Sequence, residues 1–594
     1  MDDNVKLMLG NEAVARGAYE AGVSVVSSYP GTPSTEITEN IAKYSADEIY
    51  CEWAPNEKVA AEVAIGSGIA GVRSMCCMKH VGLNVAADPL YTCSYTGVNG
   101  GIVVVVADDP GMFSSQNEQD TRFHALSAHI PVVEPSDSQE CVDFMKLAYE
   151  ISEKLDTPVI FRLTTRVAHQ RSLVKLGERQ VVTKKYTKDT WKYAMMPAMA
   201  KKRHFVVDDR QAKLKALGEG ENAELGIKIP NKVTYAEDSK KKVGIITSGV
   251  CYQYTREVFR DASILKLAVT YPLPEKLIRE FAQNVGELLV IEELEPFIEN
   301  YVKTLGIEVK GKEYFTNQGE LGTAKIREAY YGVKPQPETL GEEVNVPARP
   351  PVFCAGCPHR AVFYVLSKLG LRVCGDIGCY SMGAQAPYFG LDTVVCMGAS
   401  VSMAHGMTKA MQLNDEVDRQ KTVAVIGDST FIHSGITSLI DVAYNKGIST
   451  TIILDNSITG MTGHQQNPAM GKTIRNEETV ATDLVKLCDA IGISDVQVVD
   501  PFDMKAFREA VKGATERENP SVIIAQRPCA LLKYVKYGGP AHIDTAKCIK
   551  CGACMKLGCP AISKRADGSV VIDGSQCVGC GLCFGMCAKG AIGK

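Results

Sequence analysis

The chain has 594 residues, long enough for several domains, and its formal net charge of -4 is spread thinly over 23% charged residues. This balance excludes a nucleic acid or a membrane surface as the main partner, and the longest apolar runs, such as residues 102–107, are far shorter than the roughly 18 residues of a membrane span. The N-terminus, MDDNVKLMLG, lacks the basic and apolar parts of a signal peptide, so we expect a cytoplasmic protein.

The first part, residues 1–190, alternates β-type runs with helical stretches, as in VSVVSSYP, GGIVVVVADD and TPVIFRL. This alternation predicts an α/β fold with a doubly wound parallel sheet, in which active groups lie where strands end. One such end is the turn at residues 29–33, whose proline and glycine residues can present the Thr32 hydroxyl. Glu57 then opens a helix rich in Ala, Val, Ile and Gly, which would place its carboxylate against an apolar wall; a simple helix cap is the alternative.

Composition divides the rest of the chain. Residues 191–240 carry scattered charges with weak periodicity, which is typical of a connecting segment with surface helices, and the alternation resumes over residues 241–335. The proline-rich residues 336–350 predict a linker. A second α/β domain is expected over residues 351–540, followed by a cysteine-rich tail, residues 541–594.

Within the second α/β domain, one β run ends at Gly427, Asp428 and Ser429, a helical stretch follows, and a second β run ends before Asn456. A parallel βαβ unit brings both strand ends to one edge of a sheet, so Asp428 and Asn456 can face the same space. Carboxylate and amide oxygens suit Mg²⁺, and the Ile458 carbonyl can add a further ligand. An ordinary buried βαβ unit with two polar turns is the alternative.

Two other features of this domain carry weaker signals. The glycine-bearing turns at 375–380 and 397–400 can bring backbone N–H groups to phosphate oxygens, although either can be a plain loop. Cys354, Cys357 and His359 could bind zinc, but no second ligand pair lies nearby at zinc-finger spacing.

The tail contains CIKCGACMKLGC at 548–559 and CVGCGLCFGMC at 577–587, with eight of the chain's 21 cysteines. In a cytosolic chain this spacing indicates metal, and it is that of a two-cluster bacterial ferredoxin, in which the last cysteine of each repeat ligates the other cluster. The predicted ligands are Cys548, Cys551, Cys554 and Cys587 for one [4Fe-4S] cluster, and Cys577, Cys580, Cys583 and Cys559 for the other. Four residues precede Cys559 instead of three, and Ala588 replaces the usual proline, so the potential or nuclearity of a cluster can differ; zinc knuckles are the alternative.

Several stretches resemble known motifs. Residues 427–429 followed by Asn456 resemble the thiamine diphosphate (TPP) motif, and the element around Glu57 resembles the one whose carboxyl group hydrogen-bonds the pyrimidine ring of TPP. The YPGTPS turn, MKHVGLN at 78–84 and CAGCPH at 354–359 resemble segments of the 2-oxoacid:ferredoxin oxidoreductase family. The resemblance implies catalytic or substrate-binding roles for Glu57, Thr32, Arg122, His80 and His359. It implies cofactor contacts for Glu57, Cys357, Gly378, Cys379, Gly398, Gly427, Asp428, Ser429 and Asn456. A structural histidine at His80 and an ordinary surface arginine at Arg122 are the alternatives.

The order of the parts resembles the α subunits of the indolepyruvate branch of this family: a TPP pyrimidine-type domain, a transketolase C-terminal-like domain, a TPP diphosphate-type domain and a ferredoxin-like domain. This implies oxidative decarboxylation of an aryl 2-oxo acid (indole-3-pyruvate, phenylpyruvate or 4-hydroxyphenylpyruvate), with coenzyme A as acyl acceptor and ferredoxin as electron acceptor. It also implies a smaller β subunit carrying the family's γ-type domain, in an α₂β₂ assembly. The physiological direction stays open. So do two rival functions, a non-oxidative TPP decarboxylase, which would not need the tail cysteines, and a noncatalytic electron carrier, which would not need Glu57 and Asp428.

Overall fold

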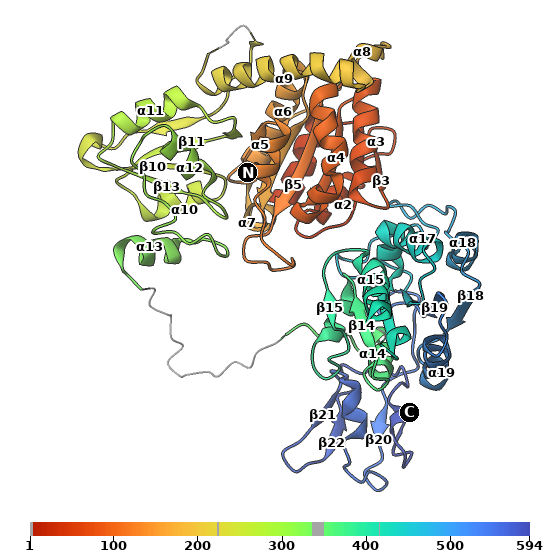
Figure 1. Ribbon diagram of the computed structural model, residues 1–594. Coiled ribbons are helices and arrows are strands. Elements are labelled where there is room, and N and C mark those ends of the chain that lie inside the picture. Colours follow the sequence, from red (N-terminus) through yellow and green to blue (C-terminus); the bar gives the residue numbers. More distant parts are fainter. Residues whose placement is uncertain (1–3, 222–224, 335–349, 415) are drawn as a thin grey trace. The chain divides into compact units, whose positions relative to one another are not determined.

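The computed structural model describes residues 4–221, 225–334, 350–414 and 416–594. The chain forms two compact units, Met1–Glu343 and Val344–Lys594 (Figure 1). The predicted linker, residues 336–350, lies outside the described residues except for Pro350. In the part of the chain that the structure describes, no helix is both long and apolar enough to cross a membrane.

The first unit is built on a sheet that is parallel except for one edge strand. Its strands lie in the order β12 (Val269–Tyr271), β6 (Val132–Val133), β7 (Val159–Thr164), β5 (Ile102–Asp108), β4 (Ser74–Lys79), β2 (Val25–Ser28) and β3 (Tyr50–Trp53). β5 is buried along its whole length. A strand covered on both faces can be a continuous apolar run, which explains the IVVVVA sequence.

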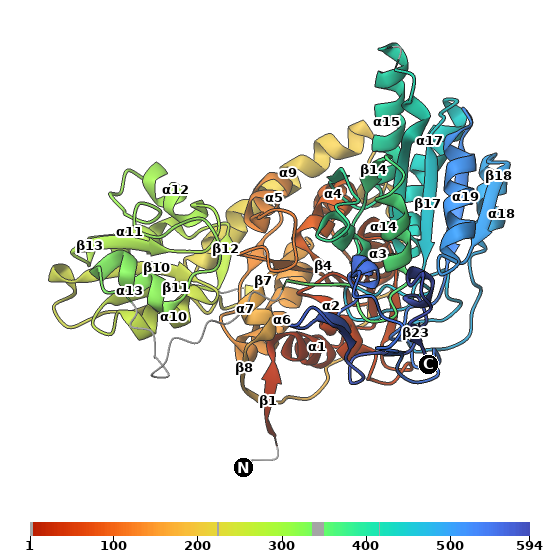
Figure 2. The same ribbon diagram turned by 90° about the horizontal axis from the view of Figure 1, so that it is seen from below.

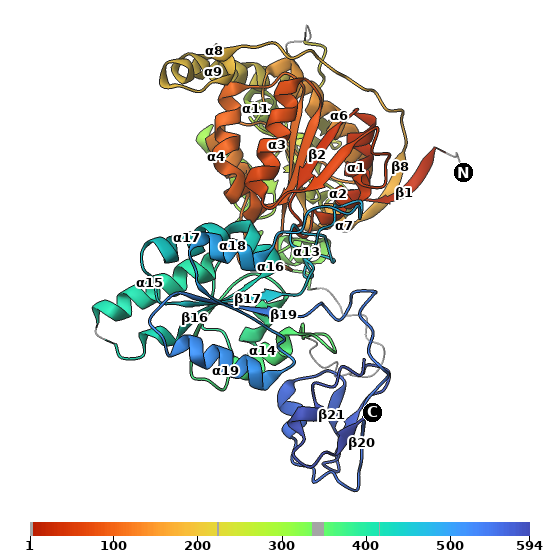
Figure 3. The ribbon, with the colours of Figure 1, turned by 90° about the vertical axis from the view of Figure 1, so that its right-hand side faces the viewer.

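Helices cover both faces of this sheet, which confirms the predicted α/β fold. They are α1 (Gly10–Glu20), α2 (Thr35–Ile41), α3 (Glu57–Ala70), α4 (His80–Thr96), α5 (Thr121–Ala128), α6 (Ser138–Leu155) and α7 (Thr165–His169). In Figure 3, α3 and α4 lie on one side of the sheet and α1 and α6 on the other. A separate antiparallel pair joins β1 (Val5–Leu9) to β8 (Arg171–Lys175). The predicted connecting segment contains α8 (Thr190–Tyr193) and the long α9 (Pro197–Gly218), whose buried Arg210 donates to the carbonyls of Ser94 and Asp156.

A second, smaller sheet follows in the same unit. Its strands lie in the order β13 (Glu287–Ile291), β10 (Val243–Ser248), β11 (Ser263–Leu267) and β9 (Lys232–Thr234), with helices α10 (Cys251–Val258), α11 (Glu275–Gln283), α12 (Phe297–Thr304) and α13 (Thr323–Tyr331). The predicted strand LAVTYPLP is divided here. β11 ends at Leu267, and β12 pairs with β6 of the first sheet. Figure 2 shows β12 on the side of β7 that faces the smaller sheet. The Glu134 N–H, which donates to the Ala268 carbonyl at 2.9 Å, holds this crossing in place.

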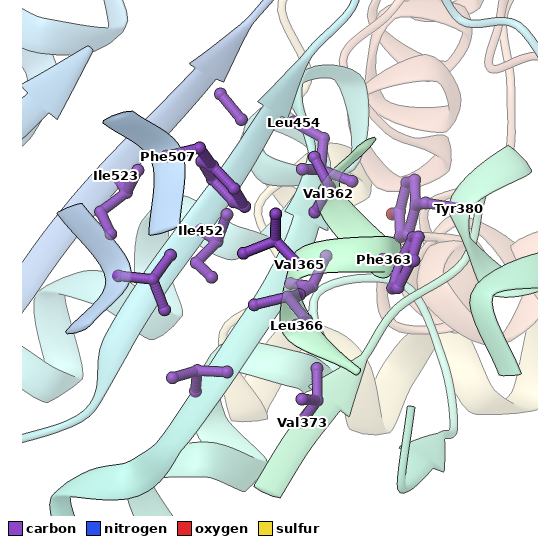
Figure 4. Close-up of a cluster of buried hydrophobic side chains, with 14 of the residues drawn as sticks. Val362, Phe363, Val365, Leu366, Val373, Tyr380, Ile452, Leu454, Phe507 and Ile523 are labelled. Atoms are coloured by element: carbon purple, nitrogen blue, oxygen red, sulfur yellow. The ribbon is translucent and has the colours of Figure 1, made fainter. Parts of the chain in front are cut away.

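The second unit has a parallel sheet in the order β15 (Thr393–Val394), β14 (Arg372–Gly375), β16 (Thr422–Gly427), β17 (Thr450–Asp455), β19 (Ser521–Gln526) and β18 (Asp495–Val499). Its helices are α14 (His359–Leu366), α15 (Ala399–Leu413), α16 (Asp428–Thr430), α17 (Ile436–Tyr444), α18 (Leu484–Ile491) and α19 (Met504–Thr515). Figure 4 shows one layer of its core, in which Phe507 of α19 lies close to Ile452 of β17 and Ile523 of β19, while Phe363 of α14 lies beside Tyr380. The predicted βαβ unit is present as β16, α16, a π-helical turn at residues 431–435, α17 and β17.

The cysteine-rich tail packs as a small lobe of this unit, drawn in dark blue in Figure 3. Two short antiparallel pairs support it, β20 (His542–Ile543) with β23 (Ile592–Gly593) and β21 (Ile562–Lys564) with β22 (Val570–Ile572). The first and last strands of the tail are therefore paired with each other, and the two cysteine repeats lie between them in the sequence.

Candidate active site

In the first unit, the predicted site residues Thr32 and Glu57 lie at the carboxyl edge of the sheet, together with two further polar residues. Thr32 follows β2, Glu57 opens α3 after β3, Lys79 ends β4, and Asp109 follows β5. Ser114 joins two of these segments, because its hydroxyl donates to the Thr32 carbonyl at 3.3 Å and its N–H donates to Asp109 at 2.9 Å.

The Glu57 side chain lies in a space kept open by a glycine. Glu57 is only 4% exposed, and the preceding Asn56 caps the helix by accepting from the Val59 N–H at 2.9 Å. A Cβ atom on Gly82 of α4 would come within 2.6 Å of Glu57 Oε1, closer than any ordinary contact. A side chain at position 82 would therefore displace the carboxyl group.

His80 is buried beside Glu57's helix. Its Nε2 lies 3.2 Å from the Asn117 carbonyl, which makes Nε2 the donor, and its buried Nδ1 has no hydrogen-bond partner among the described residues. Burial lowers the pKa of the ring, so His80 is neutral at neutral pH. It can accept a hydrogen bond at Nδ1 from a ligand.

Arg122 lies in a buried network of ion pairs. The side chain is fully buried, and its guanidinium pairs with Asp120 at 2.5 Å and with Glu292, after β13, at 2.6 Å. Nη2 also donates to the Glu293 and Glu295 carbonyls at 3.2 Å. In the structure, Arg122 therefore joins the two sheets of the first unit as a buried ion-paired group, and its substrate-binding role stays a prediction.

In the second unit, Asp428 and Asn456 follow neighbouring strands and are 2% and 8% exposed. Burial raises the pKa of Asp428 to about 7, and the nearby Asp455 adds to the rise. Asn467, which sequence reasoning missed, donates to Asp428 at 3.1 Å. The Asn456 side chain accepts from the Ile458 N–H at 3.3 Å and lies 3.5 Å from His359 Nε2. Two buried carboxylates side by side form a site that a cation would stabilise.

The glycine-bearing turns are held by Asp376, another residue that sequence reasoning missed. This buried carboxylate follows β14 and accepts from the N–H groups of Ile377, Gly398 and Ser400 at 2.8, 2.9 and 3.0 Å. Gly398 has a φ of +85°, and a Cβ there would come within 2.6 Å of the Ser434 side chain.

The ring of Tyr380 lies so close to Gly378 and Gly427 that neither position has room for a side chain. A Cβ atom at either position would come within 2.4 and 2.7 Å, respectively, of Tyr380 Cε1. The Tyr380 hydroxyl donates to the Ile377 carbonyl at 2.7 Å. Both glycines therefore make room for an aromatic ring, and the approach of Gly378 to phosphate stays a prediction.

Four cysteines from three segments gather beside His359. Burial raises the pKa of Cys357 to about 12 and that of Cys379 to about 11, and neighbouring thiols contribute, Cys379 and Cys354 for the first and Cys529 and Cys354 for the second. Burial also lowers the pKa of His359 to about 4, so the ring is neutral. The CxxC segment was predicted to line the cofactor, but Cys529 was missed because it lies about 150 positions after Cys379.

The tail thiols sort into two groups. The pKa of Cys554 is raised by burial and further by the thiols of Cys548, Cys551 and Cys587. Burial raises the pKa of Cys583 to about 12, and the thiols that add to it are those of Cys580, Cys559 and Cys577. Each group thus takes its fourth thiol from the other repeat. Within the described ranges, no three or more His, Cys, Asp or Glu side chains are arranged to hold a single metal ion.

A small hollow of about 30 Å³ is lined by all four thiols of the second group and by Ala355, Gly356 and Arg360. Arg360 is 2% exposed, and its Nη1 donates to the carbonyls of Leu557 and Gly558 in the tail. Its Nη2 donates to the carbonyls of Phe353 and Cys354. This side chain therefore holds the CxxC segment against the tail.

Comparison with known proteins places the chain in a family. Residues 16–221 match the family model "Pyruvate flavodoxin/ferredoxin oxidoreductase, thiamine diP-bdg", and residues 376–525 match "Thiamine pyrophosphate enzyme, C-terminal TPP binding domain". Indolepyruvate oxidoreductase subunit IorA of Archaeoglobus fulgidus is 38% identical over 93% of this chain and 92% of its own length. The chain belongs to the indolepyruvate oxidoreductase IorA family. The IorA subunit of Pyrococcus abyssi is 39% identical over 94% of this chain and 91% of its own length.

A solved 2-oxoglutarate:ferredoxin oxidoreductase from Magnetococcus marinus is also similar, at 18% identity and a TM-score of 0.46, over 55% of this chain and 65% of that one. Family membership makes this IorA-family chain a TPP-dependent 2-oxoacid oxidoreductase, as the sequence motifs predicted.

The residues present fit the cofactors that the IorA family implies. The buried pair Asp428 and Asp455 beside Asn456 offers the oxygen donors that Mg²⁺ requires. The space beside Gly82 holds the buried carboxyl group of Glu57, which suits a hydrogen bond to a pyrimidine ring. The tail groups offer four thiols each, and N–H groups point at sulfur, from Ala541 to Cys577 at 3.4 Å and from Ala591 to Cys587 at 3.2 Å. Such N–H···S contacts stabilise thiolate ligands.

Proposed function

We propose that the chain is the catalytic α subunit of an indolepyruvate:ferredoxin oxidoreductase. An aryl pyruvate, coenzyme A and two oxidised ferredoxins give an aryl-acetyl-CoA, CO₂, two reduced ferredoxins and one proton. Indole-3-pyruvate is the proposed substrate, with phenylpyruvate and 4-hydroxyphenylpyruvate as close competitors, because a pocket for one flat ring rejects another only modestly. Low-potential ferredoxin can drive the same reaction backwards as a reductive carboxylation.

One observation carries this proposal: the eight tail thiols form two groups, each completed by a thiol of the other repeat. That is the ligand pattern of a two-cluster ferredoxin. A non-oxidative decarboxylase would not need such a pattern, whereas an oxidoreductase that passes single electrons to ferredoxin would. We therefore assign two [4Fe-4S] clusters and a ferredoxin-like domain to residues 541–594.

TPP contacts are proposed for residues of each unit separately. Asp428, Asn456 and the Ile458 carbonyl would hold Mg²⁺, with Gly398, Gly427 and Ser429 near the diphosphate. Glu57 would hydrogen-bond the pyrimidine ring and hold its proton, while His80 accepts a hydrogen bond at Nδ1. When bound, TPP supplies the nucleophilic carbon and the electron sink that decarboxylation of a 2-oxo acid requires. Thr32 would contact the substrate with its hydroxyl, and His359, neutral in this environment, would orient Asn456.

The thiols of Cys354, Cys357, Cys379 and Cys529 are proposed as a third set of iron–sulfur ligands. Besides burial, neighbouring thiols of this set raise the pKa of Cys357, Cys379 and Cys529, which supports closeness in space. The CxxC segment, which contains Cys354 and Cys357, borders the hollow of the second tail group. The Cys529 N–H donates to the Asn456 carbonyl at 2.9 Å, so this thiol set borders Asn456 as well as the tail. The cofactor contacts that the family resemblance implies for Cys357 and Cys379 are proposed as well.

The domain division proposed is 1–190 for pyrimidine binding, 191–240 as connector, 241–335 for the transketolase C-terminal-like part, 336–350 as linker, 351–540 for diphosphate binding and 541–594 for the clusters. A smaller β subunit is the proposed partner, in an α₂β₂ assembly in the cytoplasm.

The test is to purify the chain anaerobically with its partner subunit, add indole-3-pyruvate and coenzyme A, and follow viologen reduction. The proposal expects colour that requires both substrates. Release of the aldehyde without colour would favour the decarboxylase, and intact visible absorption without any reaction would favour the electron carrier.

Two variants assign the roles. Glu57→Gln and Asp428→Ala are expected to abolish turnover while the iron–sulfur absorption stays unchanged. The matched control is Glu150→Gln, which alters an exposed carboxylate on α6 and should leave turnover unchanged.

A further inference from the structure

Lys79 is a buried ammonium group at the carboxyl edge of the first sheet. It is 9% exposed, and its Nζ donates to the Ser114 carbonyl at 2.8 Å. Among the described residues, no carboxylate oxygen forms an ion pair with it; Asp109 and Glu57 act on it only from farther away. Because a buried charge without a counter-ion is costly, this position favours an anionic ligand.

The topology of the sheet puts Lys79 where ligands bind. The chain leaves β2 toward β3 on one side and leaves β4 toward β5 on the other, so the direction of winding reverses between β2 and β4. In open α/β sheets the crevice at such a reversal, outside the carboxyl ends of the strands, is the usual ligand site. Lys79 ends β4, and Thr32 lies in the turn that follows β2.

Lys79 and the Thr32 turn are packed against each other. A Cβ atom on Gly31 would lie 3.3 Å from Lys79 Cγ and 3.5 Å from its Cδ, so the lysine stem runs along this glycine. Ser114 contacts both, with its carbonyl on Lys79 and its hydroxyl on the Thr32 carbonyl. The ammonium group, the threonine and Glu57 therefore belong to one strand-end cluster of the first unit.

We propose that Lys79 binds the carboxylate of the 2-oxo acid substrate, the role that the sequence suggested for Arg122. This inference rests on the proposed function. The Ser114 carbonyl uses one of the three N–H donors of Lys79, and the other two suit a carboxylate. Burial lowers the pKa of Lys79 to about 8, while Asp109 and Glu57 oppose that shift, so the group is mostly charged at neutral pH.

The test compares two inhibitors of the complete enzyme, indole-3-propionate and its neutral amide. Lys79→Met is expected to weaken inhibition by the carboxylate about 10- to 100-fold, the worth of a charged hydrogen bond, and to leave inhibition by the amide within twofold. Lys79→Arg keeps the cation and should retain the preference for the carboxylate. Lys43→Met is the matched control, because this lysine is exposed after α2 and bonds only to Asn40 among the described residues.

Other readouts separate the possible outcomes. Affinity for TPP and the KM for coenzyme A should not change in Lys79→Met. Equal losses for acid and amide would show a structural role, and a raised KM for coenzyme A with the acid unaffected would assign the site to a phosphate; either result overturns the proposal. If the variant does not fold, a structure of the wild-type enzyme with indole-3-propionate decides, since a carboxylate farther than about 4 Å from Nζ overturns it.

The proposed function can be refuted independently of the Lys79 assignment. If the wild-type enzyme reduces no viologen with any aryl pyruvate and coenzyme A, the oxidoreductase assignment is wrong. If the wild-type enzyme is active and Lys79→Met matches it in both inhibition constants, only the Lys79 assignment is wrong.

Discussion

Gly82→Ala tests whether the position of Glu57 controls turnover. The new Cβ would lie 2.6 Å from Glu57 Oε1, whereas ordinary contacts begin near 3.4 Å, so the carboxyl group must move by about 0.8 Å. A misplacement of about 1 Å typically costs about 100-fold in rate. Because alanine is favoured over glycine inside a helix by about 0.5 to 1 kcal/mol, the fold should stay intact. We therefore expect kcat to fall about 100-fold with little change in Tm.

The assay is viologen reduction at saturating substrates, together with Tm and the visible absorption of the clusters. Gly66→Ala is the matched control, since Gly66 lies in α3, the helix that Glu57 opens, and an added Cβ there meets nothing within 4 Å. It should keep full activity. Activity of Gly82→Ala within twofold of the wild type would refute the view that this space positions the Glu57 carboxyl group.

Three further predictions concern buried cations. Arg122→Met leaves Glu292 without an ion-pair partner among the described residues and leaves Asp120 with only the more distant Arg162, so urea unfolding should show a loss of about 3 to 5 kcal/mol with an unchanged KM for the 2-oxo acid; a higher KM at unchanged stability would contradict this. The KM for an aryl pyruvate should rise about tenfold per pH unit above about 8, because the protonated form of Lys79 binds and burial lowers its pKa; a KM that stays flat to pH 9.5 would refute it. Arg360→Met removes the donors that hold the tail carbonyls, so limited proteolysis should release the tail faster, whereas an unchanged rate would contradict the assigned contact.

The strands and the polar residues at their ends could be predicted because their signals are local. A parallel strand covered on both faces is a short apolar run, and its end is marked by the polar residue that follows, as at Asp428 and Asn456. Glu57 was found in the same way, from a single acid at the start of an apolar helix. The α/β class, TPP binding and the IorA family all followed from such segments.

What the sequence could not supply were contacts across long separations. Arg122 looked available because its partner Glu292 lies 170 positions away, and burial by a second sheet has no local signature. Cys529 is a lone cysteine in sequence, and only folding brings it to Cys379. Gly82 lay within a quoted motif, yet its purpose depends on a side chain from another helix.

The most direct test of the central claim is the metal and cofactor content of the anaerobically purified complex. The account predicts TPP near one per chain, and iron with equal acid-labile sulfide at about eight per chain for the two tail clusters, rising to about twelve with the third thiol set. Zinc in place of iron, or the absence of TPP from an active preparation, would contradict it.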